Sequence, residues 1–203
     1  MVNVIGFTGC EDWSRWFPWP DKQGWELELT EFVDIWNPLL DELQRLGVRF
    51  AHEPHPKQLA YNLETAIQVT EALDSRPEWG FNLDLANLSL AGVDPAAFVQ
   101  MLPDRIFHVH AKDLEFVGHN SRRSGWQSHG PWARPDRGFR FRIPGWGGLD
   151  WKCILSELQL AGYQGVLSIE HEDPIFSRRE GVEKAVAFLT PLLIREPRAQ
   201  EWW

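Results

Sequence analysis

Short apolar runs alternate with longer helical patterns along the chain, and four of these runs end on a residue that can bind a metal ion. The runs cover 48–53, 79–84, 105–110 and 166–170, and they end on Glu53, Asp84, His110 and Glu170. Alternating strands and helices predict a parallel α/β sheet, in which the C-terminal ends of the strands meet at one rim. Residues at that rim are typically catalytic. We therefore predict that three carboxylates and one imidazole converge there.

The same hydrophobic pattern predicts the elements around these runs. A first buried strand covers 2–8, and helices cover 27–46, 59–73, 95–101, 151–161 and 178–193. Asp94-Pro95 is a strong helix start, because aspartate caps the helix and proline suits its first position. The count is five strands, whereas a closed barrel of this kind has eight. The pattern alone leaves two architectures open, an open five-stranded sheet and a barrel without three of its βα units.

Two loops and the C-terminal tail lack a periodic pattern. The longer loop, 113–148, is rich in Gly, Arg, Trp and Pro and follows a ligand strand, which favours a lid-like loop. The other follows the first strand and contains Trp13, Trp16, Phe17 and Trp19. We expect the tail at 195–203 to be frayed. No linker or repeat divides the chain, so 1–203 is predicted to be a single domain.

Composition excludes several classes of protein. With 43% hydrophobic and 24% charged residues, the 203-residue chain suits an ordinary globular domain. A net charge of −9 without a dense Lys/Arg block disfavours nucleic acid as a partner. No apolar stretch is long enough to cross a bilayer, and the first residues lack the features of a secretion signal. The two cysteines form no disulfide framework, so we expect a cytoplasmic protein.

Longer stretches around the candidate ligands resemble a known family. They are 6–9, 36–38, 50–56, 84–88, 108–113, 144–147 and 168–173. The most specific pair is His-Val-His-Ala-Lys-Asp at 108–113 and Ser-Ile-Glu-His-Glu-Asp at 168–173. With them the chain resembles the sugar phosphate isomerase/epimerase family, the xylose-isomerase-like TIM barrels that include ketose 3-epimerases and inosose dehydratases.

The resemblance implies a partial (β/α)8 TIM barrel whose five strands correspond to strands four to eight of the family. The first three βα units have no counterpart, so we expect the chain to be either the C-terminal portion of a longer enzyme or a truncated gene product. Glu53, Asp84, His110 and Glu170 match the four metal ligands of the family. Glu53 and Glu170 also match its catalytic pair, which moves a proton off one face of a substrate and onto the other.

The implied activity is that of a divalent-metal-dependent sugar or sugar phosphate isomerase/epimerase. Its partner is a small carbohydrate, which loses a proton alpha to its carbonyl and passes through a metal-stabilised enediolate. Carboxylate and imidazole ligands suit Mn²⁺, Co²⁺, Mg²⁺ or Zn²⁺, and the sequence does not choose among them.

Further residues are candidates for substrate binding. They are His55, Asn87, Lys112, Arg142 and Trp146. Asn87 and Trp146 stand where the family often has histidine, which leaves the choice of substrate open. A surface or capping role for His55 and a solvated position for Arg142 are the competing interpretations. His108 shares a strand face with His110, where it either orients that ligand or is an ordinary core histidine.

Three other functions compete with the isomerase. They are an inosose-type dehydratase, an inactive fragment that binds only a metal or a partner, and a DNA-repair endonuclease, which the acidic balance disfavours. The exposed edges of a partial barrel also predict a homo-oligomer or other association. We expect the isolated chain to associate or to be poorly soluble, and we expect the three missing units to restore its solubility if they are added.

Overall fold

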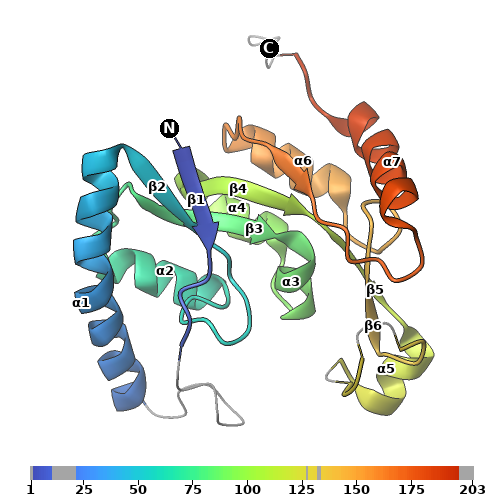
Figure 1. The fold of residues 1–203 in the computed structure, drawn as a ribbon, viewed down its shortest axis with the longest axis horizontal. Coiled ribbons are helices and arrows are strands. Elements are labelled where there is room, and N and C mark those ends of the chain that lie inside the picture. The colour runs from blue at the N-terminus through green and yellow to red at the C-terminus, as the bar shows by residue number, and fades with distance from the viewer. Residues whose placement is uncertain (1, 11–21, 127, 132–133, 197–203) are drawn as a thin grey trace, which may run out of the picture. The chain divides into compact units, whose positions relative to one another are not determined.

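The computed structural model describes residues 2–10, 22–126, 128–131 and 134–196 (Figure 1). The aromatic loop at 11–21 and most of the tail predicted to be frayed, 197–203, lie outside the described residues. The chain divides into two compact units, Met1–His110 with Gly165–Ser168, and Ala111–Gln164 with Ile169–Trp203. The expectation of a single domain over 1–203 stays a prediction.

The first unit is built on a five-stranded parallel sheet in the order β1-β2-β3-β4-β7. Its strands are β1 (Val2–Gly6), β2 (Val48–His52), β3 (Trp79–Asp84), β4 (Ile106–Ala111) and β7 (Leu167–Ile169). Each lies where an apolar run predicted it, within two residues at either end. The fold is a partial (β/α)8 barrel with five strands and surrounding helices, as predicted.

The helices of the first unit are α1 (Lys22–Leu46), α2 (Leu63–Ala72), α3 (Leu85–Leu90) and α4 (Pro95–Met101), followed by the 3₁₀ turn η1 (Pro103–Arg105). Three of them, α2, α3 and α4, begin at a residue whose side chain caps them. α4 has its predicted bounds, and Asp94 accepts a hydrogen bond from the Ala96 N–H. α2 begins later than predicted, because Asn62 and Thr65 form a reciprocal capping box at its start. α3 was not predicted, since it follows β3 without a loop.

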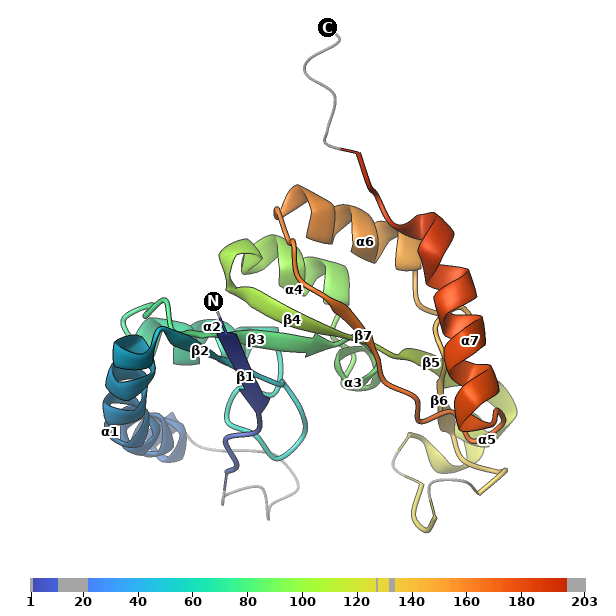
Figure 2. The ribbon, with the colours of Figure 1, turned by 45° about the horizontal axis from the view of Figure 1, so that its top comes forward.

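An aromatic cluster around Trp79 joins α1 to the sheet. Trp79 is fully buried, and its ring centroid lies 5.6 Å from Phe32, 5.3 Å from Trp36 and 5.7 Å from Phe50. Figures 1 and 2 show α1 alongside β2, to which Phe50 belongs. His52 stacks on the same indole at 5.5 Å, and burial lowers its pKa to about 4. That histidine is therefore neutral near pH 7 and acts as a core residue.

A register shift between β3 and β4 decides which side chains stand beside Asp84. Phe81 pairs with Ile106 but Asn82 pairs with His108, so β4 contains one extra residue at this point. Gly80 makes the bulge possible, because a Cβ there would collide with the Phe107 ring. Beyond the shift, Asp84 pairs with His110.

The described residues of the second unit form a small antiparallel sheet and three α-helices. The elements of this unit are β5 (Asp113–Phe116), α5 (Gly118–Ser124), β6 (Phe139–Arg142), α6 (Trp151–Leu160), α7 (Arg178–Leu189) and the 3₁₀ turn η2 (Thr190–Leu192) (Figure 2). The segment 113–148, expected to be a loop, thus contains two paired strands and a helix. Each strand has only four residues, too few for a convincing alternation. A lid function for 113–148 stays a prediction.

Asp113 organises the loop that joins β6 to α6. Its fully buried carboxylate accepts hydrogen bonds from the Gly145 and Leu149 N–H groups and from the Trp151 indole, at 2.9, 3.1 and 2.8 Å. The loop 144–148, which carries Trp146, is therefore fixed to the start of β5. Among the described residues, no helix is both long and apolar enough to span a membrane.

Candidate metal centre

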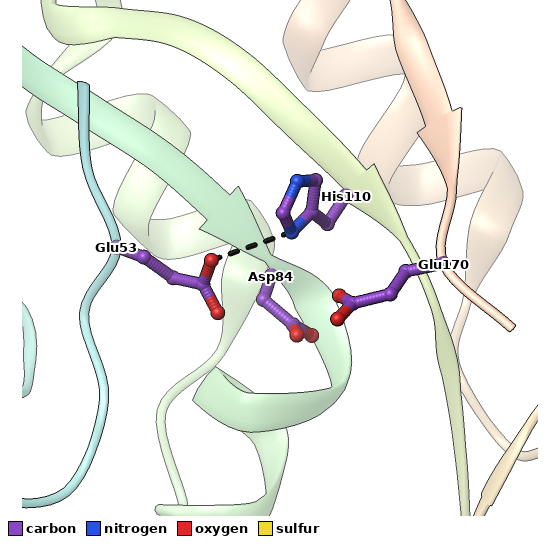
Figure 3. Close-up of side chains that lie close together, drawn as sticks. All are labelled: Glu53, Asp84, His110 and Glu170. Carbon is purple, nitrogen blue, oxygen red and sulfur yellow. Dashed lines mark ion pairs between the residues drawn. The ribbon is translucent and has the colours of Figure 1, made fainter. Parts of the chain in front are cut away.

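Three of the predicted ligands converge in the first unit. Glu53 follows β2, Asp84 ends β3 and His110 belongs to β4, so neighbouring parallel strands present them at the same rim. One ligand atom of each lies within 4.8 Å of the others, and Figure 3 shows the side chains pointing toward one another. His110 Nδ1 lies 3.3 Å from Glu53 Oε2. Asp84 is fully buried and Glu53 is 7% exposed.

The start of α3 fixes the orientation of Asp84. Oδ1 accepts hydrogen bonds from the Ala86 and Asn87 N–H groups, both at 3.0 Å. Oδ2 accepts a third from Asn87 Nδ2 at 2.7 Å. One aspartate thus ends a strand, caps a helix and faces the other candidate ligands.

Two asparagine side chains hold the Glu53 carboxylate. Asn82 Nδ2 donates to Oε2 at 2.9 Å, and Asn87 Nδ2 donates to Oε1 at 3.1 Å. Asn82 was missed in the sequence, although its position two residues before Asp84 on one strand face was a usable signal. Asn87 was expected to bind substrate. The structure places its amide on two candidate ligands, and substrate binding by Asn87 stays a prediction.

Two other histidines of the first unit lie near these ligands in the sequence. His108 Nε2 lies 2.8 Å from Ser168 Oγ, which ties β4 to β7, and its ring centroid is 5.5 Å from that of His110. Burial, and after it the neighbouring His110, lowers the pKa of His108. His55 Nδ1 lies 2.8 Å from the carbonyl oxygen of Pro56. Substrate binding by His55 stays a prediction.

Glu170, also drawn in Figure 3, belongs to the second unit. Its backbone N–H donates to the Ala111 carbonyl at 3.3 Å. Lys112 Nζ lies 3.1 Å from Glu170 Oε2 and 2.9 Å from Glu172 Oε2, and the Lys112 side chain is nearly buried. The Lys112 ammonium thus stands between two carboxylates. Its predicted contact with substrate is untested.

The other two candidates for substrate binding also belong to the second unit. Arg142 is buried, and it donates from Nε to Asp173 Oδ2 at 2.8 Å and from a terminal nitrogen to Glu115 at 2.6 Å. Trp146 is 47% exposed, and its ring centroid lies 4.8 Å from that of Phe176. An ion-paired arginine has less freedom to bind substrate than an exposed indole, but both roles stay predictions.

The donor set of the first unit fits a divalent cation. Two carboxylates placed together in a buried position are unfavourable unless hydrogen bonds or a cation compensate their charge. The Glu53 carboxylate contacts two neutral amides and the His110 ring, so its negative charge remains available to a cation. Oxygen and imidazole donors suit Mn²⁺, Co²⁺, Mg²⁺ or Zn²⁺.

The parallel strands, with candidate ligands at their C-terminal ends, define the chain as a (β/α)8-barrel protein, and comparison with known families gives the same class. Residues 5–192 match the family described as xylose isomerase-like TIM barrel, and the chain belongs to this family.

Two curated proteins are similar to this chain in sequence. The chain is 31% identical over 161 residues to the uncharacterised protein YfiH of Bacillus subtilis (strain 168), covering 77% of this chain and 51% of YfiH. It is 30% identical over 146 residues to an inosose dehydratase of Geobacillus thermodenitrificans (strain NG80-2), covering 68% of this chain and 48% of that enzyme. The chain thus spans about half the length of these curated relatives.

A solved structure confirms the fold at lower identity. The 3-keto-D-glucoside 4-epimerase YcjR of E. coli superposes with a TM-score of 0.65 at 17% identity, covering 93% of this chain and 63% of that chain. At this identity the similarity supports the fold alone.

Proposed function

We propose that this chain is part of a divalent-metal-dependent isomerase or epimerase that acts on a sugar or a sugar-like hydroxyketone. The observation that supports it is the convergence of Glu53, Asp84 and His110 at the C-terminal ends of three parallel strands. That rim is where (β/α)8 barrels carry their chemistry. Membership of the family supports a carbohydrate as the substrate.

Glu53, Asp84 and His110 would hold the cation, and we propose Glu170 as the fourth ligand. Glu170 directly follows β7, which is the sheet neighbour of β4. A bound cation would supply Lewis acidity that withdraws charge from a substrate oxygen. Glu53 and Glu170 are the proposed bases, which remove a proton beside the carbonyl and return one. Such general acid–base action contributes about 10²- to 10⁴-fold.

An inosose-type dehydratase is the second candidate, favoured by the 30% identity to an inosose dehydratase. Both reactions start with removal of a proton from the carbon next to a carbonyl. They differ in the next step, because a dehydratase expels a hydroxyl group and forms a product that absorbs in the ultraviolet.

Solvent deuterium exchange tests the step that both candidates share. The purified chain, loaded in turn with Mn²⁺, Co²⁺, Mg²⁺ or Zn²⁺, is incubated in D₂O with D-fructose or an inosose. We expect metal-dependent deuterium at the carbon beside the carbonyl, detected by NMR, and loss of exchange in Glu53→Gln. Glu64→Gln, an exposed glutamate at the start of α2, is the matched control. Absence of exchange with every metal favours the inactive fragment instead.

We also propose that the chain associates through β1. This strand is an edge of the sheet, and Val2, Val4 and Ile5 are 65%, 47% and 38% exposed. An open apolar edge favours pairing with another chain. Val4→Lys is expected to shift sedimentation velocity profiles toward the monomer, whereas Leu160→Lys, at an exposed leucine of α6, leaves them unchanged. A wild-type chain that stays monomeric at all concentrations contradicts this prediction.

A further inference from the structure

The side chains of Asn82 and Asn87 surround the candidate ligands of the first unit with neutral hydrogen-bond donors. Asn82 is fully buried and Asn87 is 6% exposed. Asn82 donates to one oxygen of Glu53, and Asn87 donates to the other oxygen and to Asp84 Oδ2. The two amides together therefore fix the plane of the Glu53 carboxylate and link it to Asp84.

Within the part of the chain that the structure describes, the Asn82 amide is oriented so that its nitrogen is hydrogen-bonded and its buried oxygen is not. Its Nδ2 faces Glu53 Oε2 and lies 3.2 Å from His110 Nδ1, whereas its buried Oδ1 has no hydrogen-bond partner among the described residues. A buried acceptor without a partner is destabilising, because it has lost its hydrogen bonds to water. Reversing the amide would not help, because Oδ1 would then face the Glu53 oxygen, another acceptor. The favourable contribution of Asn82 is therefore its donation to Glu53.

Neutral donors have an advantage at a cation site. A lysine or arginine would orient Glu53 equally well, but its positive charge would compete with the cation for the carboxylate. An amide leaves the full negative charge in place. Each oxygen of the Glu53 carboxylate has two acceptor positions and accepts one amide hydrogen bond, which leaves a position for a metal ion.

We propose that Asn82 and Asn87 are positioning residues, which hold Glu53 and Asp84 in the orientation that a divalent cation requires. This inference rests on the proposed function, because it assumes that these carboxylates bind a metal. Hydrogen bonds behind metal ligands fix ligand orientation, and their removal typically lowers affinity about 10- to 100-fold. The two amides act through Glu53 and Asp84 and need no contact with the metal or the substrate.

Calorimetric titration with Mn²⁺ tests the proposal in Asn82→Ala and Asn87→Ala. Each substitution is expected to raise the dissociation constant for Mn²⁺ about 10- to 100-fold. Asn62→Ala is the matched control, because Asn62 caps α2 in the same unit and touches none of the candidate ligands. It is expected to lower the melting temperature while leaving the Mn²⁺ dissociation constant unchanged. The absorption spectrum of bound Co²⁺ adds a readout of ligand geometry, which a general loss of stability would not move.

The outcomes separate this inference from the proposed function. If the wild-type chain binds neither Mn²⁺ nor Co²⁺, the proposed function fails and the inference fails with it. If the wild-type chain binds Mn²⁺ but Asn82→Ala and Asn87→Ala bind within twofold of it, only the inference is overturned. An equal loss in Asn62→Ala also overturns it, because the effect is then general destabilisation. Should Asn82→Ala not fold, Asn87→Ala decides the question, since Asn87 lies in the first turn of a short helix.

Discussion

Asp84→Asn is expected to weaken Mn²⁺ binding by more than about 100-fold, beyond the loss typical of residues that only support a ligand. The substitution keeps the size of the side chain, and its Oδ1 can still accept the hydrogen bonds of Ala86 and Asn87 at the start of α3. It removes one negative charge from the buried site that would hold the cation, and it replaces the oxygen that accepts the hydrogen bond of Asn87 Nδ2. The fold should therefore persist while the affinity falls, and calorimetric titration together with thermal melting measures both.

Asp94→Asn is the matched control for this substitution. Asp94 caps α4 of the same unit through the Ala96 N–H, and it lies outside the group of candidate ligands. Its replacement should leave the dissociation constant for Mn²⁺ unchanged. If Asp84→Asn binds Mn²⁺ as tightly as the wild-type chain does, Asp84 is not a ligand and the proposed centre is wrong.

Trp79→Ala is expected to lower the free energy of unfolding by about 3–5 kcal/mol, the usual loss for a large aromatic residue in a core. Trp79 is fully buried and contacts aromatic rings from α1 and β2, so its removal leaves a cavity between the helix and the sheet. Because a typical domain is stable by only about 5–15 kcal/mol, much of the folded population could be lost. Urea denaturation measures the change.

A tryptophan of the second unit provides the comparison. Trp126 is 45% exposed, and Trp126→Ala should change the free energy of unfolding by less than about 0.5 kcal/mol. Equal losses of unfolding free energy in Trp79→Ala and Trp126→Ala would contradict the inference that the aromatic cluster around Trp79 stabilises the first unit. Trp79 begins the strand that ends on Asp84, so the same substitution is also expected to weaken Mn²⁺ binding.

Asp84→Asn and Trp79→Ala act at opposite ends of β3, and their effects separate stability from metal binding. The Trp79 end packs against α1 and stabilises the first unit, whereas the Asp84 end presents the candidate ligand. This is the division expected of a (β/α)8 barrel, in which one rim provides stability and the other provides chemistry. Asp84→Asn should affect binding with little change in stability, and Trp79→Ala should affect both.

The sequence by itself determined the strands and the candidate ligands at their C-terminal ends. Apolar runs ending on Glu53, Asp84 and His110 were sufficient to predict parallel strands with candidate ligands at one rim. The start of α4 was equally clear, because the cap at Asp94 and the proline after it are local signals. Periodicity and capping involve residues close in the chain, which is why a single sequence reveals them.

Tertiary structure decided what depends on the register between strands. The hydrogen bond from Asn82 to Glu53 joins residues 29 positions apart and exists only because β2 and β3 pair as they do. The bulge at Phe107 and the role of Gly80 likewise depend on contact between β3 and β4. β5 and β6 were missed because each is stabilised by the other rather than by a pattern of its own. Strand pairing is a long-range interaction, and hydrophobic periodicity along one chain does not encode its register.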